Sequence, residues 1–346
     1  MTRTLFLGDD QLGGLVADLL GAGQAVIGPA SLGAGRSVLY RELNDPAQLE
    51  LAGPPPALSL KEFFLPPTEP LLGWSGSPRE LRLDEVPAPR APRVIIGARP
   101  CDTAALPVLD KLMGWDYRDE PWFARREATT IVSIACREPD GSCFCTAVGG
   151  GPANPAGADV LLERADGGWR AEVLTERGAE LAARFPARFA EAAAGAASAA
   201  PRWTAELPPI PADFPAWLAG RFDDPLWAEL ALRCHGCGAC AAVCPTCHCF
   251  DIVDECAGPS CGTRRRNWDT CQTARFTVHA SGHNPRPAQP SRTRQRLLHK
   301  FSVFPARFGA LLCTGCGRCV RGCPAGIDIV EALDHLGRAA AQEQGA

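Results

Sequence analysis

The sequence contains 346 residues, enough for two or three domains of ordinary size with their own hydrophobic cores. Its 39 acidic residues outnumber its 35 Lys and Arg residues, and the net charge of −4 gives no general attraction to nucleic acid or anionic membranes. No apolar run is long enough for a membrane-spanning helix, and the first residues lack a signal-peptide segment. We therefore expect a cytoplasmic protein with no membrane span and no nucleic-acid partner.

The first half of the chain is predicted to contain a parallel pair of strands. Residues 93–98 and 130–135 are short apolar runs that are typical of buried strands. Between them, Asp102 is expected to cap a helix that extends to about Met113. A strand, a helix and a second strand in this order predict a parallel crossover inside an α/β layer.

A hairpin is predicted after this crossover. Residues 159–164 and 169–174 are strand-like and are separated by a short turn that contains two glycines. Together these elements predict a mixed fold, α+β/α/β, for an N-terminal domain that covers residues 1–190.

Four cysteines of this domain are expected to meet at one edge of the sheet. Cys101 and Cys136 each follow a predicted strand, and ligands in parallel α/β sheets gather beyond the carboxyl ends of the strands. Cys143 and Cys145 lie in the next loop and can fold back onto the same edge. Four thiols are the number that a [4Fe-4S] cluster requires, so we predict a cluster here. The alternatives are buried thiols that pack as small apolar groups, or a zinc site.

The composition changes after the predicted sheet domain. An Ala-rich stretch is followed by a Pro-rich one, and residues 191–217 are therefore expected to be a linker. Residues 218–346 are expected to form a mostly helical domain of the ferredoxin type with two [4Fe-4S] clusters and a long insertion at residues 250–310. A terminal helix is expected at residues 327–340.

Thirteen of the 17 cysteines lie between residues 234 and 323, and eight of them form two identical motifs. Cytoplasmic thiols stay reduced, which favours metal binding or redox chemistry over disulfides. Each motif has the spacing C-x2-C-x2-C-x3-C-P, in which three thiols hold one cluster and the fourth holds the other cluster. The first predicted ligand set is Cys234, Cys237, Cys240 and Cys323, and the second is Cys313, Cys316, Cys319 and Cys244. The alternative is a pair of structural zinc sites, which more often use two C-x2-C pairs.

Five further cysteines lie outside these sets. Cys247, Cys249 and Cys271 are close to the first motif in sequence or in the same segment, so one of them could replace Cys244 or tune a cluster. The alternative is that they are buried thiols that line the cluster pocket. Cys256 and Cys261 flank a Gly-Pro turn and are expected on a surface loop without a redox role.

Basic residues are concentrated between residues 286 and 307. They could form a positive surface patch that docks an acidic partner, or the solvated face of a helix. The segment lacks the interleaved aromatic residues of a nucleic-acid site. The basic residues concerned are Arg292, Arg294, Arg296, Lys300 and Arg307.

Several stretches of the chain resemble a known family. The sequence is similar to the beta subunit of cytoplasmic [NiFe] sulfhydrogenases and, closely related to it, to the electron-transfer subunit of anaerobic sulfite reductase. The resemblance implies a non-catalytic electron-transfer subunit that connects a flavin subunit handling NAD(P)H to a catalytic hydrogenase or sulfite reductase subunit. The Ala- and Pro-rich stretches, Cys256 and Cys261 depart from the family pattern. The stretches that carry the resemblance are residues 61–70, 97–102, 143–145, 244–251, 267–271 and 276–286.

Three functions remain open at this point. The first is the electron-transfer subunit of a hydrogenase complex, the second is the same role in anaerobic sulfite reductase, and the third is a zinc-binding structural protein or cluster-based sensor. We expect no catalytic residue in this chain. Gly8, Gly13 and Gly14 do not have the G-x-G-x-x-G spacing, so no bound flavin or NAD is expected either.

Overall fold

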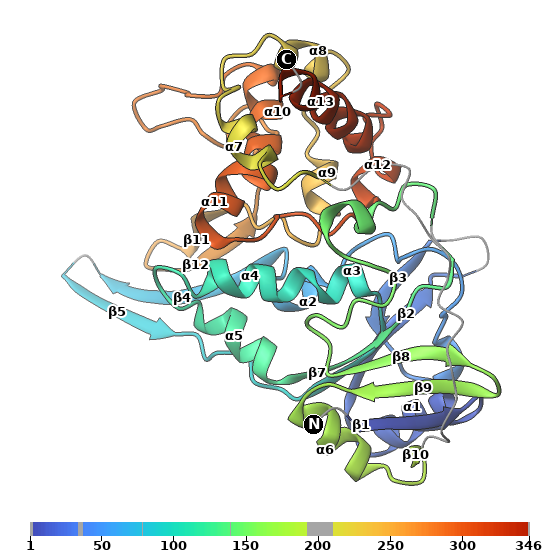
Figure 1. Cartoon of the computed structure of the whole chain (residues 1–346). Helices are drawn as coiled ribbons and strands as arrows, with labels where there is room; N and C mark the ends of the chain where they lie inside the picture. The colour runs from blue at the N-terminus through green and yellow to red at the C-terminus, as the bar shows by residue number, and fades with distance from the viewer. Residues whose placement is uncertain (1–2, 34–36, 78, 139, 192–209, 345–346) are drawn as a thin grey trace.

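The computed structural model describes residues 3–33, 37–77, 79–138, 140–191 and 210–344. Figure 1 shows a sheet-rich N-terminal region below, a largely helical C-terminal region above, and a strand-rich arm that projects to one side. Most of the expected linker, residues 191–217, lies outside the described residues.

The N-terminal region is built on a large sheet, which has eight strands among the described residues. Its order is β10-β1-β9-β8-β7-β6-β2-β3. Neighbouring strands from β2 through β6 and β7 to β8 run parallel, and the remaining pairs are antiparallel. The predicted parallel pair is confirmed as β6 and β7, and the predicted hairpin as β8 and β9. The strands are β1 (Arg3–Gly8), β2 (Ala25–Ser31), β3 (Val38–Glu42), β6 (Arg93–Ala98), β7 (Thr129–Ile134), β8 (Val160–Ala165), β9 (Gly168–Val173) and β10 (Ala190–Glu191).

Both faces of the large sheet are buried. On β6, Val94 and Ile96 pack with α1 and α6 on one face, whereas Ile95 packs with α2, α4 and α5 on the other. Strands buried on two sides read as continuous apolar runs, which is why residues 93–98 lack alternation. The helices of this region are α1 (Gln11–Gly21), η1 (Pro46–Gln48), α2 (Lys61–Phe64), α3 (Pro100–Thr103), α4 (Ala105–Met113), α5 (Glu120–Glu127), η2 (Cys145–Val148) and α6 (Glu176–Arg184).

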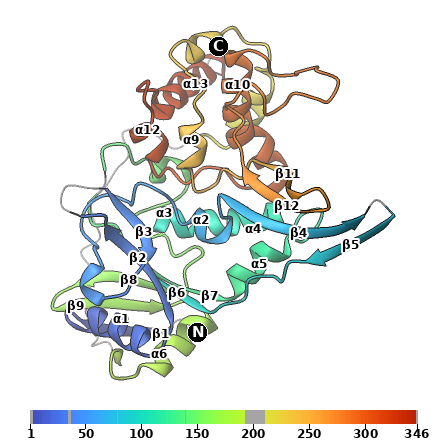
Figure 2. The same ribbon diagram turned by 180° about the vertical axis from the view of Figure 1, so that it is seen from behind.

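A small sheet, with four strands among the described residues, joins the two halves of the chain. The hairpin of β11 (Phe250–Gly258) and β12 (Cys261–Trp268) pairs through β12 with β4 (Thr68–Ser77), which pairs with β5 (Glu80–Glu85). This sheet forms the projecting arm in Figures 1 and 2. The C-terminal segment thus supplies strands as well as helices, and its expected mostly helical character is not confirmed.

Helices surround the two cysteine motifs. Their apolar side chains form a separate core that includes Phe214, Trp227, Leu297, Phe301 and Leu336. No helix within the described ranges is both long and apolar enough to cross a membrane. The elements are α7 (Phe214–Ala219), α8 (Leu226–Ala231), α9 (Ala239–Ala242), α10 (Gln289–Leu298), the π-helical turn η3 (His299–Val303), α11 (Phe304–Phe308), α12 (Arg318–Arg321) and α13 (Ile329–Gln344).

A buried ion pair connects these regions and overturns one prediction. Asp102 does not cap a helix, because it lies inside α3, whose N-cap is Arg99. Its two carboxylate oxygens accept hydrogen bonds from Arg318 of α12, each 2.7 Å long, and one also accepts from the Tyr40 hydroxyl at 2.8 Å. A bidentate guanidinium binds a carboxylate more strongly than backbone amides do. Asp102 therefore pairs with Arg318, which is distant in sequence, instead of capping the nearby helix.

We predict that Asp102→Ala lowers the free energy of unfolding by roughly 3–5 kcal/mol, because Arg318 would remain charged and buried without its partner. Urea denaturation under anaerobic conditions measures the loss. Arg338→Ala is the control, since Arg338 pairs with Asp334 at the surface and should contribute almost nothing. Equal effects of the two substitutions would contradict the role assigned to the buried pair.

Candidate iron-sulfur sites

All 17 cysteines lie in the described ranges, and each is a free thiol. Their positions can therefore be compared directly with the three predicted ligand sets. Among the described residues, no group of three or more Cys, His, Asp or Glu side chains lies close enough to hold a single metal ion, whereas the four thiolates of a [4Fe-4S] cluster are spread around a larger group.

The first set converges on one pocket. Cys234, Cys237 and Cys240 come from the loop before α9 and its first turn, and Cys323 reaches the same pocket from the end of α12. The fourth thiol of the second motif therefore lies with the first three of the first motif. Two glycines make the tight loop possible, since Gly236 and Gly238 have φ values of 67° and 78°, which other residues rarely adopt.

The second set is more deeply buried. Burial raises the pKa of Cys313 to about 12, Lys300 opposes this shift, and the nearby thiols of Cys244 and Cys319 add to it. Burial likewise raises the pKa of Cys316 to about 11, again with Cys244 and Cys319 as neighbours. Cys244 thus lies among the first three thiols of the second motif, as the crossed arrangement requires. Such thiols hold their protons until a metal displaces them.

The third set meets at the edge of the large sheet. Cys101 lies in α3, Cys136 follows β7, and Cys143 and Cys145 lie in the next loop. Burial raises the pKa of Cys145 to about 12, with Cys136 and Cys143 among its neighbours. Burial also raises the pKa of Cys101, which has Cys136 beside it. The structure therefore brings together all four of these residues.

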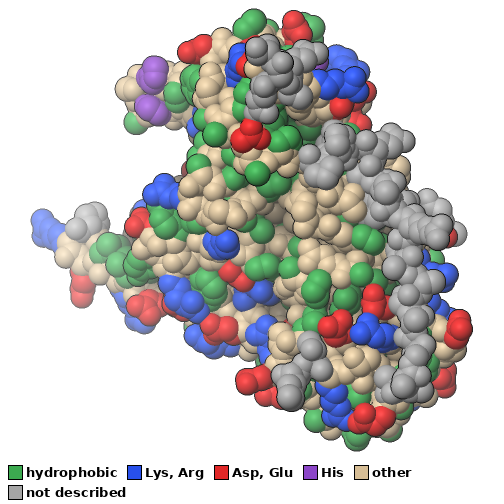
Figure 3. Space-filling view, viewed as in Figure 1, with side chains coloured by type: hydrophobic (Ala, Val, Ile, Leu, Met, Phe, Trp, Pro, Cys, Tyr) green, Lys and Arg blue, Asp and Glu red, His purple; other side chains and the backbone are tan. Residues whose placement is uncertain are grey.

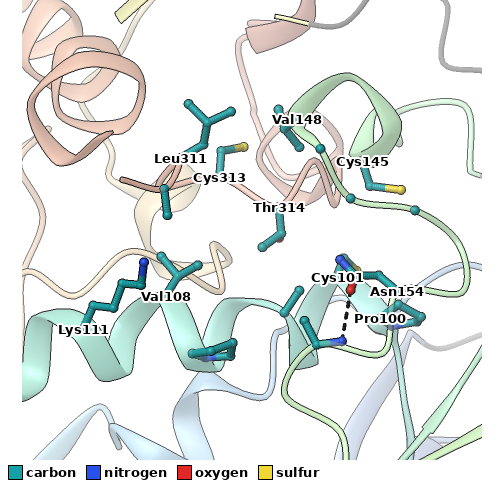
Figure 4. Close-up of a pocket in the computed structure, with 17 residues that line it drawn as sticks. Pro100, Cys101, Val108, Lys111, Cys145, Val148, Asn154, Leu311, Cys313 and Thr314 are labelled. Atoms are coloured by element: carbon teal, nitrogen blue, oxygen red, sulfur yellow. Dashed lines mark hydrogen bonds between the residues drawn. The ribbon is translucent and has the colours of Figure 1, made fainter. Parts of the chain in front are cut away.

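The third set lies against the loop of the second motif. The Phe144 amide donates a hydrogen bond of 2.8 Å to the Gly315 carbonyl, and a Cβ atom on Gly315 would lie only 2.5 Å from the Cys145 backbone. Only glycine permits this approach. Figure 4 shows Cys101, Cys145 and Cys313 around one pocket between the two segments. Since Cys240 of the first set has Cys319 and Cys244 as neighbours, the three sets lie in a row.

Cys247, Cys249 and Cys271, which are half-buried, lie beside this row and each interacts with another thiol. Cys247 interacts with Cys244, and Cys249 with Cys271, whose pKa falls to about 6 because it accepts a hydrogen bond from Cys249. Both sequence-based interpretations of Cys247 therefore stay open, since its thiol is next to a predicted ligand. Cys256 and Cys261 are exposed, but they lie on β11 and β12 rather than in a loop.

The predicted positive patch and its alternative, a solvated helix face, are both wrong for three of the five basic residues, whereas Arg307 is exposed. Arg292 and Lys300 are only 8% and 3% exposed, and Arg296 is half-buried. These three residues follow one another at intervals of four along α10 and η3, so they share one face, and that face is turned inward. In Figure 3, basic side chains are interspersed with acidic ones over the visible face. The spacing could have revealed the shared face, but not that it is buried.

Lys300 and Arg296 lie among the thiols. The Lys300 ammonium is 3.3 Å from the Cys244 sulfur and donates to the Thr246 hydroxyl at 3.2 Å and the Leu312 carbonyl at 3.0 Å. The neighbours of Arg296 include Cys240 and Cys319, and these thiols raise its pKa against the opposing effect of burial. Its Nε atom is buried without a hydrogen-bond partner among the described residues.

A third buried cation comes from α2. Lys61 is 4% exposed, donates to the carbonyls of Ala241 and Ala242 at 3.3 Å, and lies 3.9 Å from the centre of the Trp268 ring. Burial lowers its pKa, and the nearby thiols of Cys247 and Cys244 oppose this shift.

The charges of Lys300, Arg296 and Lys61 would be balanced by an anionic group that the thiols bind. No ion pair links Lys300, Arg296 or Lys61 to a carboxylate within the described part of the chain. Burying a cation without a counter-charge costs several kcal/mol in general. An iron-sulfur cluster held by four thiolates has a net negative charge and would supply it.

Comparison with known proteins agrees with this arrangement. Residues 233–327 match the family model described as a 4Fe-4S dicluster domain. The matched domain, the motifs and the convergent thiols together define the class: this is an iron-sulfur protein.

A relative over nearly the full length is more specific. Sulfhydrogenase 2 subunit beta of Pyrococcus furiosus is 29% identical over 315 residues, which cover 86% of this chain and 88% of that protein. The resemblance to the sulfhydrogenase beta subunit is thus confirmed. Together with the dicluster domain, it makes this chain an iron-sulfur electron-transfer protein.

Two histidines near the second set predict a pH dependence. Burial lowers the pKa of His248 to about 3 and that of His299 to about 4, and the two rings lie 5.5 Å apart. Both are therefore neutral in the folded protein, whereas the unfolded chain takes up protons below about pH 6.5. Stability is present above that pH and is lost as the pH falls toward the folded values.

For His248 alone, we expect a loss of about 2 kcal/mol between about pH 7.5 and pH 5.0. His248→Gln keeps a polar group near the Thr246 carbonyl but does not titrate, so its unfolding free energy should fall less over this range. Urea denaturation at the two pH values measures the difference. An identical pH dependence in both proteins would show that folding does not lower the pKa of His248.

Proposed function

We propose that the chain holds three [4Fe-4S] clusters and relays electrons inside a cytoplasmic [NiFe] hydrogenase complex of the sulfhydrogenase type. In this proposal it connects a flavin subunit that handles NAD(P)H to the catalytic subunit. The observation that carries the proposal is the succession of three four-thiol sets, each beside the next. Bound there, the clusters would take up and release single electrons.

The protein groups around the first and second sets support this assignment. In the first set, the side chain of Gln289 donates to the Cys234 sulfur at 3.0 Å, and the Ile327 amide donates to the Cys323 sulfur at 3.3 Å. In the second set, the Gly315 amide donates to the Cys313 sulfur at 3.5 Å. Such N–H groups stabilise thiolates, and their number and direction tune a cluster. We assign the proposed ligands as predicted: Cys234, Cys237, Cys240 and Cys323; Cys313, Cys316, Cys319 and Cys244; Cys101, Cys136, Cys143 and Cys145.

The accessibility of both ends of the row supports a role between two partner subunits. Cys237, in the first set, is exposed, so that end of the row is accessible to another subunit. At the other end, Cys101 and Cys145 line the open pocket of Figure 4. The same relay would suit an anaerobic sulfite reductase, but the sulfhydrogenase relative favours the hydrogenase complex.

Iron analysis tests the number of clusters. The anaerobically purified chain should contain about twelve iron and twelve acid-labile sulfide atoms, since each of three cubes holds four of each. Cys136→Ser should remove about four iron atoms and leave the other two sets occupied. Cys256→Ser, at an exposed cysteine outside the sets, is the matched control and should remove none. A wild-type content near eight iron atoms would exclude the third cluster, and the absence of iron would exclude the whole proposal.

A pair of variants decides between Cys244 and Cys247 as the fourth ligand of the second set. We expect Cys244→Ser to weaken or remove that cluster, while Cys247→Ser leaves the iron content unchanged, because Cys244 lies among the other three thiols. Iron content and the EPR spectrum after reduction measure the outcome. Loss of iron from Cys247→Ser alone would reverse the assignment.

A further inference from the structure

The second set differs from the first in the charge that surrounds it. We propose that Lys300, which is not a ligand, raises the reduction potential of the cluster held by Cys313, Cys316, Cys319 and Cys244 above that of the cluster held by Cys234, Cys237, Cys240 and Cys323. This inference rests on the proposed function and deepens it: of these two clusters, the second would hold electrons preferentially.

The backbone fixes Lys300 in place. The residue belongs to the π-helical turn η3, between α10 and α11, and π-helical turns often mark functional positions. The next two residues, Phe301 and Ser302, are 0% and 4% exposed, so the turn is buried together with Lys300. The Thr246 hydroxyl and the Leu312 carbonyl accept two hydrogen bonds and direct the ammonium toward the Cys244 sulfur.

The surroundings of Lys300 suit a charged ammonium. Its nitrogen is 3.3 Å from the Cys244 sulfur, 3.2 Å from the Thr246 hydroxyl and 3.0 Å from the Leu312 carbonyl, which match the three N–H donors of an ammonium. A fixed positive charge stabilises the reduced form of a cluster, because that form has gained one electron and no proton. Burial acts in the opposite direction, since it disfavours the more negative form.

The first set lacks an equivalent charge, whereas at the third set the buried Arg99 guanidinium lies beside Cys136. Gln289 and the Ile327 amide, which donate to sulfurs of the first set, are neutral groups. Near Cys101, the Arg318 guanidinium is neutralised by its bidentate pairing with Asp102. Arg296 lies between Cys240 and Cys319 and therefore acts on both ferredoxin-type sets. Among the described residues, Lys300 is thus the cation that contacts a proposed ligand of the second set and distinguishes this set from the first.

The test is an anaerobic redox titration of the full-length chain, followed by EPR. Lys300→Met should lower the reduction potential of one cluster and leave the others nearly unchanged, with the iron content of the wild type. Lys300→Arg keeps the charge and should have a potential close to that of the wild type. Arg307→Met removes an exposed cation from the adjacent helix α11 and should leave every potential unchanged.

A second uncharged variant guards against loss of the cluster. If Lys300→Met does not retain its iron, Lys300→Gln, which can still donate to Thr246 or Leu312, should show the lowered potential. Unchanged potentials in an iron-replete uncharged variant overturn the inference, as does loss of iron from both, because Lys300 would then be structural. A wild-type chain without iron would instead refute the proposed function itself.

Discussion

The structure depends on the balance between buried cations and buried thiols. Lys300, Arg296 and Lys61 enter the interior beside cysteine sulfurs, and no ion pair joins them to a carboxylate within the described residues. A protein interior does not tolerate such charges without compensation. Thiolates that hold an anionic cluster supply the compensating negative charge. Cluster binding would therefore be part of the folding of this region rather than a step that follows folding.

Two further contacts set the order of the three sets. The ion pair of Arg318 with Asp102 fixes α12, and with it the second motif, against the large sheet. The close approach of Gly315 to Cys145 leaves no side chain between the second and third sets. Electron transfer between sites requires proximity, and both contacts maintain it. The fold therefore positions the sites through the Arg318–Asp102 ion pair and through the absence of a side chain at Gly315.

The sequence predicted the features that depend on residues close together in the chain. The apolar run of β6 and the spacing of the two cysteine motifs are short-range features, and the structure has the strand and the crossed convergence of thiols. Contacts between distant segments were not predictable in the same way. The pairing of β12 with β4, the capture of Asp102 by Arg318 and the inward direction of Lys300 each depend on a partner far away in sequence. From the sequence alone, a basic residue on a helix is interpreted as a surface charge, because the sequence does not show the thiols that face it.

Hydrogen–deuterium exchange of the holo and iron-free chains tests most directly whether clusters balance the buried cations. Removal of iron should sharply reduce the protection of α10 and the π-helical turn, where Arg296 and Lys300 would lose their counter-charge, while β6 and β7 of the large sheet stay protected. Equal protection of residues 289–303 with and without iron would contradict the account, because the cations would then be stable without any cluster beside them.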